Sequence, residues 1–327
     1  MGLLDHQLMF GVESTYGTAV TPTRTYEYNS EGIEESYGRT EGDPLRTGTH
    51  VMRSDRFAPY FAGAAGSIQL DVMSKGFGVL LQHMLGGIST GALTDSSYTH
   101  TATMADLFGK SLTCQVARPF NPSGTVQPFT FEGGKVGGFT ISNSVEGNLV
   151  LDLDMDFEQV ATGTALATAA YPTGMENFTW AGGDLQIGGE DAGFCVNEVS
   201  VQVANNLNVD RRCISNGTDK KEPTAGRREV TFSLSGDFAS LAHRNRAASA
   251  TAAGALAALE FSWTAPTLIG VTTYPSLTIS IPVGRFDAWS GAAGGADAIT
   301  QELSGVGRYN GTDSPISIAY VSTDATP

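Results

Sequence analysis

Residues 149–158, LVLDLDMDFE, place a carboxylate at every second position, at Asp152, Asp154, Asp156 and Glu158. The positions between them are apolar, so the segment has the two-residue period of a β-strand with one buried face and one acidic face. Neighbouring carboxylates on such a face lie about 7 Å apart, within a Debye length, and repel one another. Calcium binding would need the turns and the glycine of a calcium loop, which an alternating strand lacks. The pattern therefore indicates an acidic surface and not a metal site.

Two glycine-containing segments resemble nucleotide-binding motifs but are incomplete. Residues 109–111, GKS, end like a phosphate-binding loop, yet Met104 stands where the motif needs its first glycine. Residues 305–310, GVGRYN, begin like a dinucleotide-binding loop, yet Asn310 replaces the last glycine. No nucleophile accompanies a base in a recognisable motif. We therefore expect no enzyme activity, no cofactor and no catalytic or metal-binding residues.

The cysteine content and the net charge argue against further classes. Cys114, Cys195 and Cys213 form no CxxC pair, so we predict neither a disulfide framework nor a zinc site, and we interpret Cys195 and Cys213 as small core residues. The net charge of −15 argues against a surface that grips a nucleic acid duplex. The sequence shows no signal peptide and no apolar stretch of membrane-spanning length, which predicts synthesis in a reducing cytosol and no membrane partner.

The clearest element that could position the acidic strand is another strand followed by a helix. Residues 66–72 alternate between polar and apolar side chains, as a half-buried strand does. From Ser74 the apolar residues fall at helical spacing, with Ser74 able to cap the helix and Gly86 able to end it. The same order returns in residues 228–246, where the helix is expected to begin near Asp237.

The similarity continues beyond the helix and predicts a duplication. Each copy has two further strands at similar spacing, residues 98–101 and 111–116 in the first and residues 261–264 and 276–281 in the second. We therefore expect two copies of one β-rich module, with residues 66–118 superposing on residues 228–283. The Ala-rich residues 247–258 either extend the second helix or form a loose connection.

A run of small residues, ATGTALATAA, separates the two copies. We predict four segments, an N-terminal arm (1–22), a first β module (23–160), a linker (161–177) and a second β module (178–327). The arm is too short to fold alone, so we expect that a partner holds it.

Two aperiodic loops, residues 37–66 and 210–228, hold about half of the 19 Lys and Arg residues. Long loops of this kind are functional or mobile. Either they are solvated, or they dock on acidic groups of a neighbouring subunit, where each exposed pair contributes roughly 0–1 kcal/mol. The candidate docking residues are Arg39, Arg46, Arg53, Arg56, Arg211, Arg212, Lys220, Lys221, Arg227 and Arg228.

Four stretches together resemble a known family. They are GVESTYGTAVTPT at residues 11–23, RSDR at 53–56, GSIQLDVMSKGFG at 66–78 and VSVQVANNLNVDRR at 199–212. With these stretches the chain resembles the tail tube proteins, or major tail proteins, of long-tailed bacteriophages (siphophages), and is most similar to those of phages that infect actinobacteria. The resemblance spans most of the chain.

The resemblance implies a mainly β fold of two β-sandwich or partial-barrel modules, each with a short flanking helix. In this family such modules join into a ring with a continuous inner β-barrel, which leaves no exposed strand edges. Rings stack into a tube, and loops and terminal arms reach the next ring. The implied function is that of a structural virion protein, the tail tube subunit, which forms the channel for DNA ejection.

The implied partners are further copies of the chain, the tape measure, terminator and distal tail proteins, and viral DNA that passes without specific binding. Three chains with two modules each would form a pseudo-hexameric ring, and a ring of six chains is the alternative. A basic wall would hold DNA through its phosphates. We therefore expect Asp152, Asp154, Asp156 and Glu158 to face the channel, the alternative being a solvated outer face.

Two other interpretations stay open. The chain could be another virion component, such as a tail terminator or a decoration protein. From a different class, it could be a carbohydrate-binding β-sandwich in which Trp180, Trp263 and Trp289 stack on sugars.

Overall fold

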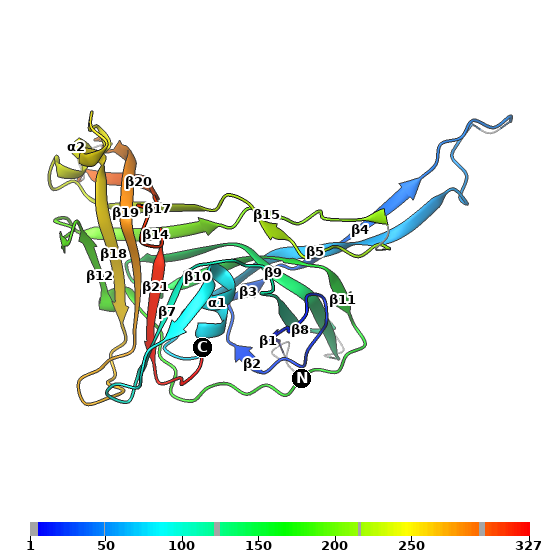
Figure 1. Cartoon of the computed structure of the whole chain (residues 1–327), viewed down its shortest axis with the longest axis horizontal. Coiled ribbons are helices and arrows are strands. Elements are labelled where there is room, and N and C mark those ends of the chain that lie inside the picture. Colours follow the sequence, from blue (N-terminus) through cyan, green and yellow to red (C-terminus); the bar gives the residue numbers. More distant parts are fainter. Residues whose placement is uncertain (1–5, 49, 121–124, 215–216, 294–297) are drawn as a thin grey trace.

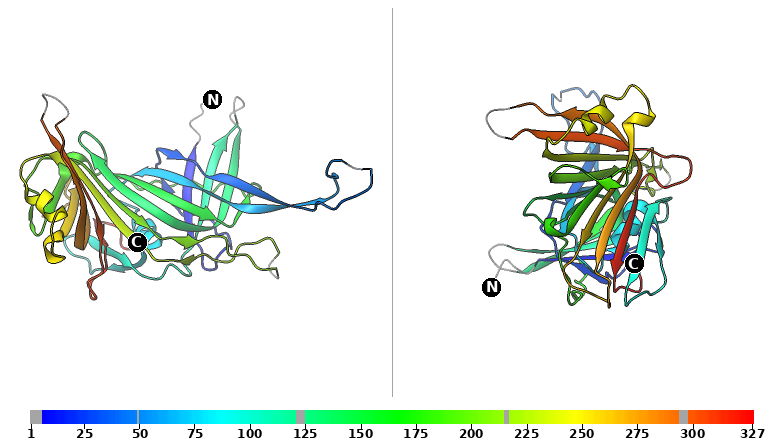
Figure 2. Two further views of the ribbon diagram at one scale, coloured as in Figure 1. Left: turned by 90° about the horizontal axis from the view of Figure 1, so that it is seen from above. Right: turned by 90° about the vertical axis from the view of Figure 1, so that its left-hand side faces the viewer.

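The computed structural model describes residues 6–327 apart from residue 49 and residues 121–124, 215–216 and 294–297. The chain is mainly β, as predicted, and its strands pair antiparallel in sheets that do not close into a barrel. Figure 1 shows a β-rich body from which one long hairpin extends, and Figure 2 shows the same hairpin from above. No helix within these described residues is long and apolar enough to cross a membrane.

The strands and helices follow one another in two series, before and after the predicted linker. The first series is β1 (Gln7–Val12), β2 (Arg24–Tyr26), β3 (Ser30–Glu31), β4 (Glu34–Glu41), β5 (Phe57–Asp71), α1 (Gly78–Leu85), β6 (Gly86–Thr90), β7 (Tyr98–Met104), β8 (Leu112–Pro119), β9 (Val126–Ser144), β10 (Val150–Phe157) and β11 (Gln159–Ala161). The second is a 3-10 turn (Trp180–Gly182), β12 (Gly183–Ile187), β13 (Glu190–Asp191), β14 (Val196–Ala204), β15 (Leu207–Asn208), β16 (Thr224–Ala225), β17 (Glu229–Asp237), α2 (Ala242–Ala247), a 3-10 turn (Ala253–Ala255), β18 (Leu256–Thr264), β19 (Ser276–Ser290), β20 (Thr300–Gly307) and β21 (Ser317–Ser322).

One order of strand pairing occurs twice. In the first half β4, β5, β10 and β9 lie side by side, and in the second half β14, β17, β20 and β19 do so in the same order. The fourth strand of each set is long, and its first part pairs with another strand, β9 with β8 and β19 with β18. β1 then pairs with β8 as β12 pairs with β18. This repetition supports the interpretation of the chain as a duplication.

The sequence comparison aligned the two copies one strand out of step. We expected residues 98–101 and 111–116, which lie in β7 and β8, to correspond to residues 261–264 and 276–281, which lie in β18 and β19. The pairing order instead matches β8 with β18 and β9 with β19, so the hairpin of β6 and β7 is additional in the first half. Alternation could not show this, because every half-buried strand alternates.

The two halves share one sheet across the predicted domain boundary. β9 pairs with β14 from Gly138↔Ala204 to Ser144↔Glu198, which gives the continuous order β4–β5–β10–β9–β14–β17–β20–β19. A second junction joins β7 to β21, and the buried apolar residues of both halves form one cluster. The two predicted modules therefore share one sheet and one core. We call this order of strands the shared sheet.

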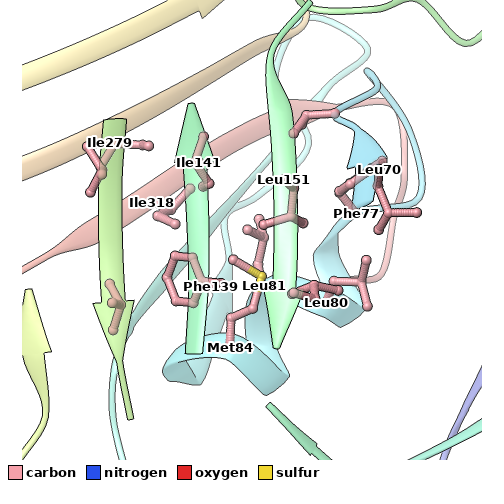
Figure 3. Packing of buried hydrophobic residues seen from close by; sticks show 14 of the residues in the cluster. Leu70, Phe77, Leu80, Leu81, Met84, Phe139, Ile141, Leu151, Ile279 and Ile318 are labelled. Carbon is pink, nitrogen blue, oxygen red and sulfur yellow. The ribbon is translucent and has the colours of Figure 1, made fainter. Parts of the chain in front are cut away.

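The apolar face of the shared sheet packs on α1. Leu80, Leu81 and Met84 of α1 point towards Phe139 of β9 and Leu151 of β10 (Figure 3). All five side chains are buried. Burial of a side chain of this size contributes about 1.5–3 kcal/mol, so these contacts hold α1 firmly against the sheet. The helix lies on one face of the sheet only and does not cover the opposite face.

The first helix begins later than predicted. α1 starts at Gly78, with Phe77 as its N-cap, and ends as expected at Gly86, whose φ of 98° suits a glycine. Ser74 does not cap the helix, because its hydroxyl accepts a hydrogen bond from the backbone N–H of Glu176 (3.0 Å).

The second helix is shorter than predicted. α2 covers only Ala242–Ala247 and not the stretch from Asp237, and Leu241, just before it, is 58% exposed. Of residues 247–258, only Ala247 belongs to the helix, and the others form turns, a 3-10 turn and the start of β18.

The N-terminal segment is held by its own chain. β1 pairs with β2 and β8, and both Leu8 and Phe10 are fully buried. The expectation that a partner holds this segment is therefore wrong for its described part. Residues 1–5 of the predicted arm lie outside the described residues.

Candidate channel surface and docking arm

The shared sheet has one apolar face and one polar face. Along its polar face, Asp152 lies opposite Thr140, Thr140 opposite Gln202, and Gln202 opposite Thr231. Polar side chains from β10, β9, β14 and β17 thus form a row across the junction between the two halves. The alternation of each strand places the intervening apolar side chains on the α1 side. We call this surface the polar face.

Acidic side chains dominate the charge of the polar face. Its carboxylates include those of Asp71, Asp152, Asp154, Glu198, Glu229, Asp237 and Glu302, which the strand registers place on the same side of the sheet. Arg285, a basic side chain on this face, forms an ion pair with Asp287. A surface of this composition repels phosphate groups.

The four carboxylates that we expected to face the channel together lie in different environments. Asp152 is half-buried and accepts a hydrogen bond from the Gln69 amide (3.0 Å), and Asp154 is exposed. Asp156 is only 8% exposed and forms an ion pair with Lys220 (2.8 Å). The loop before β17 covers this end of β10, so Asp156 presents no open carboxylate. Asp152 and Asp154 remain the candidates for a channel wall.

Glu158 follows the end of β10 and lies in a different environment. Partial burial, together with the nearby carboxylates of Asp219 and Glu13, raises the pKa of Glu158 to about 7. Its backbone N–H donates to the carbonyl of Glu132 (2.9 Å). The Glu158 side chain is half-buried and lies beside Gly17 and Gly133, apart from the exposed polar row.

Replacing Glu158 by glutamine is expected to stabilise the protein above pH 7 and to change little near pH 4. The pKa of Glu158 is about 7 in the folded chain, against an ordinary value of 4.5. The contribution of the protonated carboxyl is therefore complete below pH 4.5 and is lost as the pH rises through 7. Thermal unfolding between pH 4 and pH 9 measures this, with the exposed Glu260→Gln as control. A difference in melting temperature that does not vary with pH would contradict the assignment.

The first basic loop is the hairpin that extends from the body in Figures 1 and 2. We expected residues 37–66 to be irregular, but β4 and β5 stay paired out to Glu41↔Phe57, and only residues 42–56 lie outside the strands. The outer part of this hairpin is exposed on both sides, so its sequence has no reason to alternate. We call residues 34–63 the arm and residues 42–56 its tip.

The tip and the adjoining end of β5 carry exposed apolar side chains that sequence inspection missed. Leu45 is fully exposed, Val51 is 79% exposed, and Met52 and Phe57 are each 50% exposed. A cluster of exposed apolar side chains at the end of a projecting segment is typical of a docking surface. The sequence did contain a signal for this surface, because apolar side chains in a stretch without strand or helix periodicity have no buried face to occupy.

Two of the four arginines of the arm lie close to the same acidic side chain, that of Asp55. Arg53 forms an ion pair with Asp55 (2.8 Å), and Arg56 lies 3.5 Å from the same carboxyl group. Arg39 and Arg46 are exposed. The arm therefore offers charge as well as apolar surface to a partner.

The second basic loop packs on its own chain. Arg212 donates to the carbonyl of Ala62 in β5 (2.7 Å), Lys220 pairs with Asp156 of β10, and Arg228 donates to the carbonyl of Leu85 at the end of α1 (3.1 Å). The hairpin of β14 and β17 lies beside β9, which brings this loop against the first half.

Two further residues of that loop complete the contact. Glu222 forms an ion pair with Lys135 of β9 and accepts a hydrogen bond from the Gly109 N–H (2.6 Å), while Arg211 donates to the carbonyl of Glu222 (2.5 Å). Lys221 and Arg227 stay exposed. Arg211, Arg212, Lys220 and Arg228 are thus occupied within the chain, which leaves the arm and these two exposed side chains as candidates for contacts between subunits.

The three tryptophans do not form one platform. Trp263 is buried and donates its indole N–H to Asn143 (3.1 Å), whereas Trp180 is 47% exposed, and both border a cavity of about 220 Å³. Trp289 packs on Phe238 elsewhere, with ring centroids 5.5 Å apart. The three tryptophans therefore do not form one surface on which a sugar could stack.

The cysteines and the carboxylates give no metal centre in the part of the chain that the structure describes, where no group of three or more His, Cys, Asp or Glu side chains is placed to hold an ion. Cys114 is buried, but Cys195 and Cys213 are exposed, which corrects their interpretation as core residues.

Comparisons with known proteins place the chain in a family. The search of curated proteins gives no match. The profile of the family described as phage tail tube protein matches residues 4–307, nearly the whole chain. This match agrees with the β-rich fold and confirms the resemblance to tail tube proteins. The chain therefore belongs to the phage tail tube protein family and is a structural protein of the phage tail.

Proposed function

We propose that this chain is the tail tube subunit of a long-tailed phage, and that its copies form rings whose inner wall is the polar face. The observation that carries the proposal is the shared sheet, whose apolar side is buried in the core, in part against α1, while the other side presents a polar, acidic surface across both halves. Stacked rings would form the channel through which DNA leaves the virion. A structural role of this kind needs no catalytic residues.

The charge of the polar face suits a channel for DNA. A duplex carries about one negative charge per 1.7 Å of its axis, and a wall with many Lys or Arg side chains would bind it by releasing counterions. Asp152 and Asp154, together with Glu198 and Glu302 of the second half, would instead repel the phosphates. The duplex would then stay near the axis and slide without being held.

The repeat suggests the size of the ring. Because each chain supplies the same strand order twice, three chains would supply six modules, and six chains would supply twelve. The proposed partners are further copies of the chain within and between rings, with tape measure, terminator and distal tail proteins inside the tube or at its ends. The tip of the arm would reach the next ring. The mature protein would reside in the virion tail after synthesis in the host cytoplasm.

Replacing Asp152 and Asp154 by lysine is expected to permit tube formation and to impair DNA delivery. The substitutions leave the apolar face unchanged but put positive charge where DNA passes, so tubes should bind duplex DNA at low salt and lose it as salt rises. Electron microscopy of purified protein, DNA retention on the tubes and plaque formation measure the three effects. Glu190→Lys with Glu260→Lys, outside the polar face, is the matched control. Wild-type delivery by the double-lysine variant would contradict the channel assignment, and monodisperse monomers from the wild-type chain would contradict the function.

A further inference from the structure

The junction between the two halves is a strand pairing that joins one repeat to the next. β9 and β14 pair over the range from Gly138↔Ala204 to Ser144↔Glu198. The flanking hydrogen bonds, Val145 N–H to the Asn197 carbonyl and Asn205 N–H to the Gly137 carbonyl, show that the odd-numbered residues of β14 direct their backbone groups to β9. The last strand of one repeat thus meets the first strand of the following repeat.

The strand registers identify the counterparts of both edges. β9 and β19 each carry a bulge against the neighbouring strand, after Val136 in β9 and after Phe286 in β19, so Gly138 corresponds to Ala288. Ser30 lies opposite Gln69 as Glu198 lies opposite Ser235 in the equivalent strand. β3 and β4 of the first repeat therefore correspond to β14 of the second. In this alignment Ser36 occupies the position of Ala204.

Both counterparts are edges of the sheet. Within the described residues β4 pairs only with β5, and residues 286–290 of β19 pair only with β20. The Gly32 N–H bonds to the Ser67 carbonyl, so even-numbered residues here face β5 and Glu35 directs its backbone outward. In β19 the same alternation turns the backbone of Trp289 away from β20. Unprotected edges of this kind invite pairing with another chain.

The two edges cannot meet within one molecule. They lie at opposite ends of the eight strands of the shared sheet, roughly 34 Å apart at the usual spacing between strands. Only a strand from another chain can complete these edges, and the repeat points to a second copy of the chain as its source. The contact joins two different edges, so it continues in one direction and can close into a ring.

We propose that β19 of one copy pairs antiparallel with β4 of the next copy, with Ala288 opposite Ser36, Trp289 opposite Glu35 and Ser290 opposite Glu34. The inference rests on the proposed function and adds the two edges, the register and the direction of the ring. The ladder is shorter than that of β9 and β14, because the Ile33 carbonyl already accepts a hydrogen bond from Arg118 (2.8 Å). In this register Glu34 joins the polar face of the neighbouring copy.

A cysteine pair tests the register directly. Ser36 and Ala288 would be a pair without hydrogen bonds between them, with Cα atoms about 4.5 Å apart, which a disulfide can bridge. In a background with Cys195→Ser and Cys213→Ser, the variant Ser36→Cys with Ala288→Cys is expected to give a ladder of covalent oligomers on oxidation. The control pair Thr40→Cys with Ala288→Cys, four residues out of register, is expected to stay uncrosslinked.

A proline tests the edge without a disulfide. Glu35→Pro removes an N–H that points outward, so the pairing of β4 with β5 survives, whereas the contact with the next copy loses a central hydrogen bond. We expect Glu35→Pro to keep the melting temperature of the monomer and to lose rings, while Glu35→Ala assembles normally.

The outcomes separate this inference from the function on which it rests. Rings or tubes that form without the 36–288 crosslink, or that form from Glu35→Pro as readily as from Glu35→Ala, would overturn the pairing and leave the tube function standing. A parent chain that gives no rings under any condition would overturn both. A ladder from the register-matched pair alone supports the proposal.

Discussion

Replacing Leu45, Val51 and Met52 by serine is expected to abolish tube assembly and to leave the fold of the monomer unchanged. These side chains are between 50% and 102% exposed at the tip, so the isolated chain gains little stability from them. If the tip docks on the next ring, each buried side chain contributes about 1.5–3 kcal/mol, and the contact recurs around the ring. Sedimentation and electron microscopy measure assembly, and thermal unfolding measures the fold.

Two comparisons make this result specific. Leu93→Ser with Val271→Ser removes exposed apolar side chains from loops away from the arm, and it is expected to assemble normally. Arg53→Glu with Arg56→Glu is expected to slow assembly less severely, since both arginines are exposed beside Asp55 and such pairs contribute roughly 0–1 kcal/mol each. Wild-type polymerisation by the triple serine variant would show that the tip is a solvated loop.

Replacing Glu222 by alanine is expected to destabilise the protein by about 3–5 kcal/mol, because it leaves a buried ammonium group without its counter-charge. The Lys135 side chain is 1% exposed, and its ammonium group is held by Glu222 and by the Leu107 carbonyl (2.6 Å). Burial lowers the pKa of Lys135, which shows the cost of keeping it charged there. Urea unfolding measures the loss.

A double variant distinguishes the loss of the ion pair from the cost of a buried charge that has no partner. Lys135→Met with Glu222→Gln removes both charges and keeps much of the volume, so it is expected to be more stable than Glu222→Ala alone. A loss below about 1 kcal/mol in Glu222→Ala, or a double variant less stable than the single one, would contradict this account. The result matters for function because Glu222 ties the loop of the second half to β9 of the first.

Local patterns predicted the parts of the fold in which one face is buried. The alternation of residues 149–158 identified β10, and the change of period after Val72 located α1, because burial on one side leaves a period in the sequence. The acidic side of β10 was visible for the same reason. The family resemblance added the tail tube assignment, which no motif could supply alone.

The remaining features depend on contacts between distant segments. The arm has no buried face, so its strands left no period, and its apolar tip was taken for a basic loop. Asp156 looked equivalent to Asp154 until Lys220, 64 residues away, proved to be its partner. The assignment of Lys220 and Arg228 to a partner surface failed in the same way, since nothing local shows that their loop folds back onto β10 and α1.

A high-resolution electron cryomicroscopy reconstruction of tubes assembled from the wild-type chain tests the central claim most directly. The proposed function predicts a hollow tube in which β10, β9, β14 and β17 form the inner wall, with Asp152 and Asp154 facing the lumen and α1 on the outer side of the sheet. A reconstruction in which the polar face lies on the outside of the tube, or is covered by a neighbouring subunit, would contradict it.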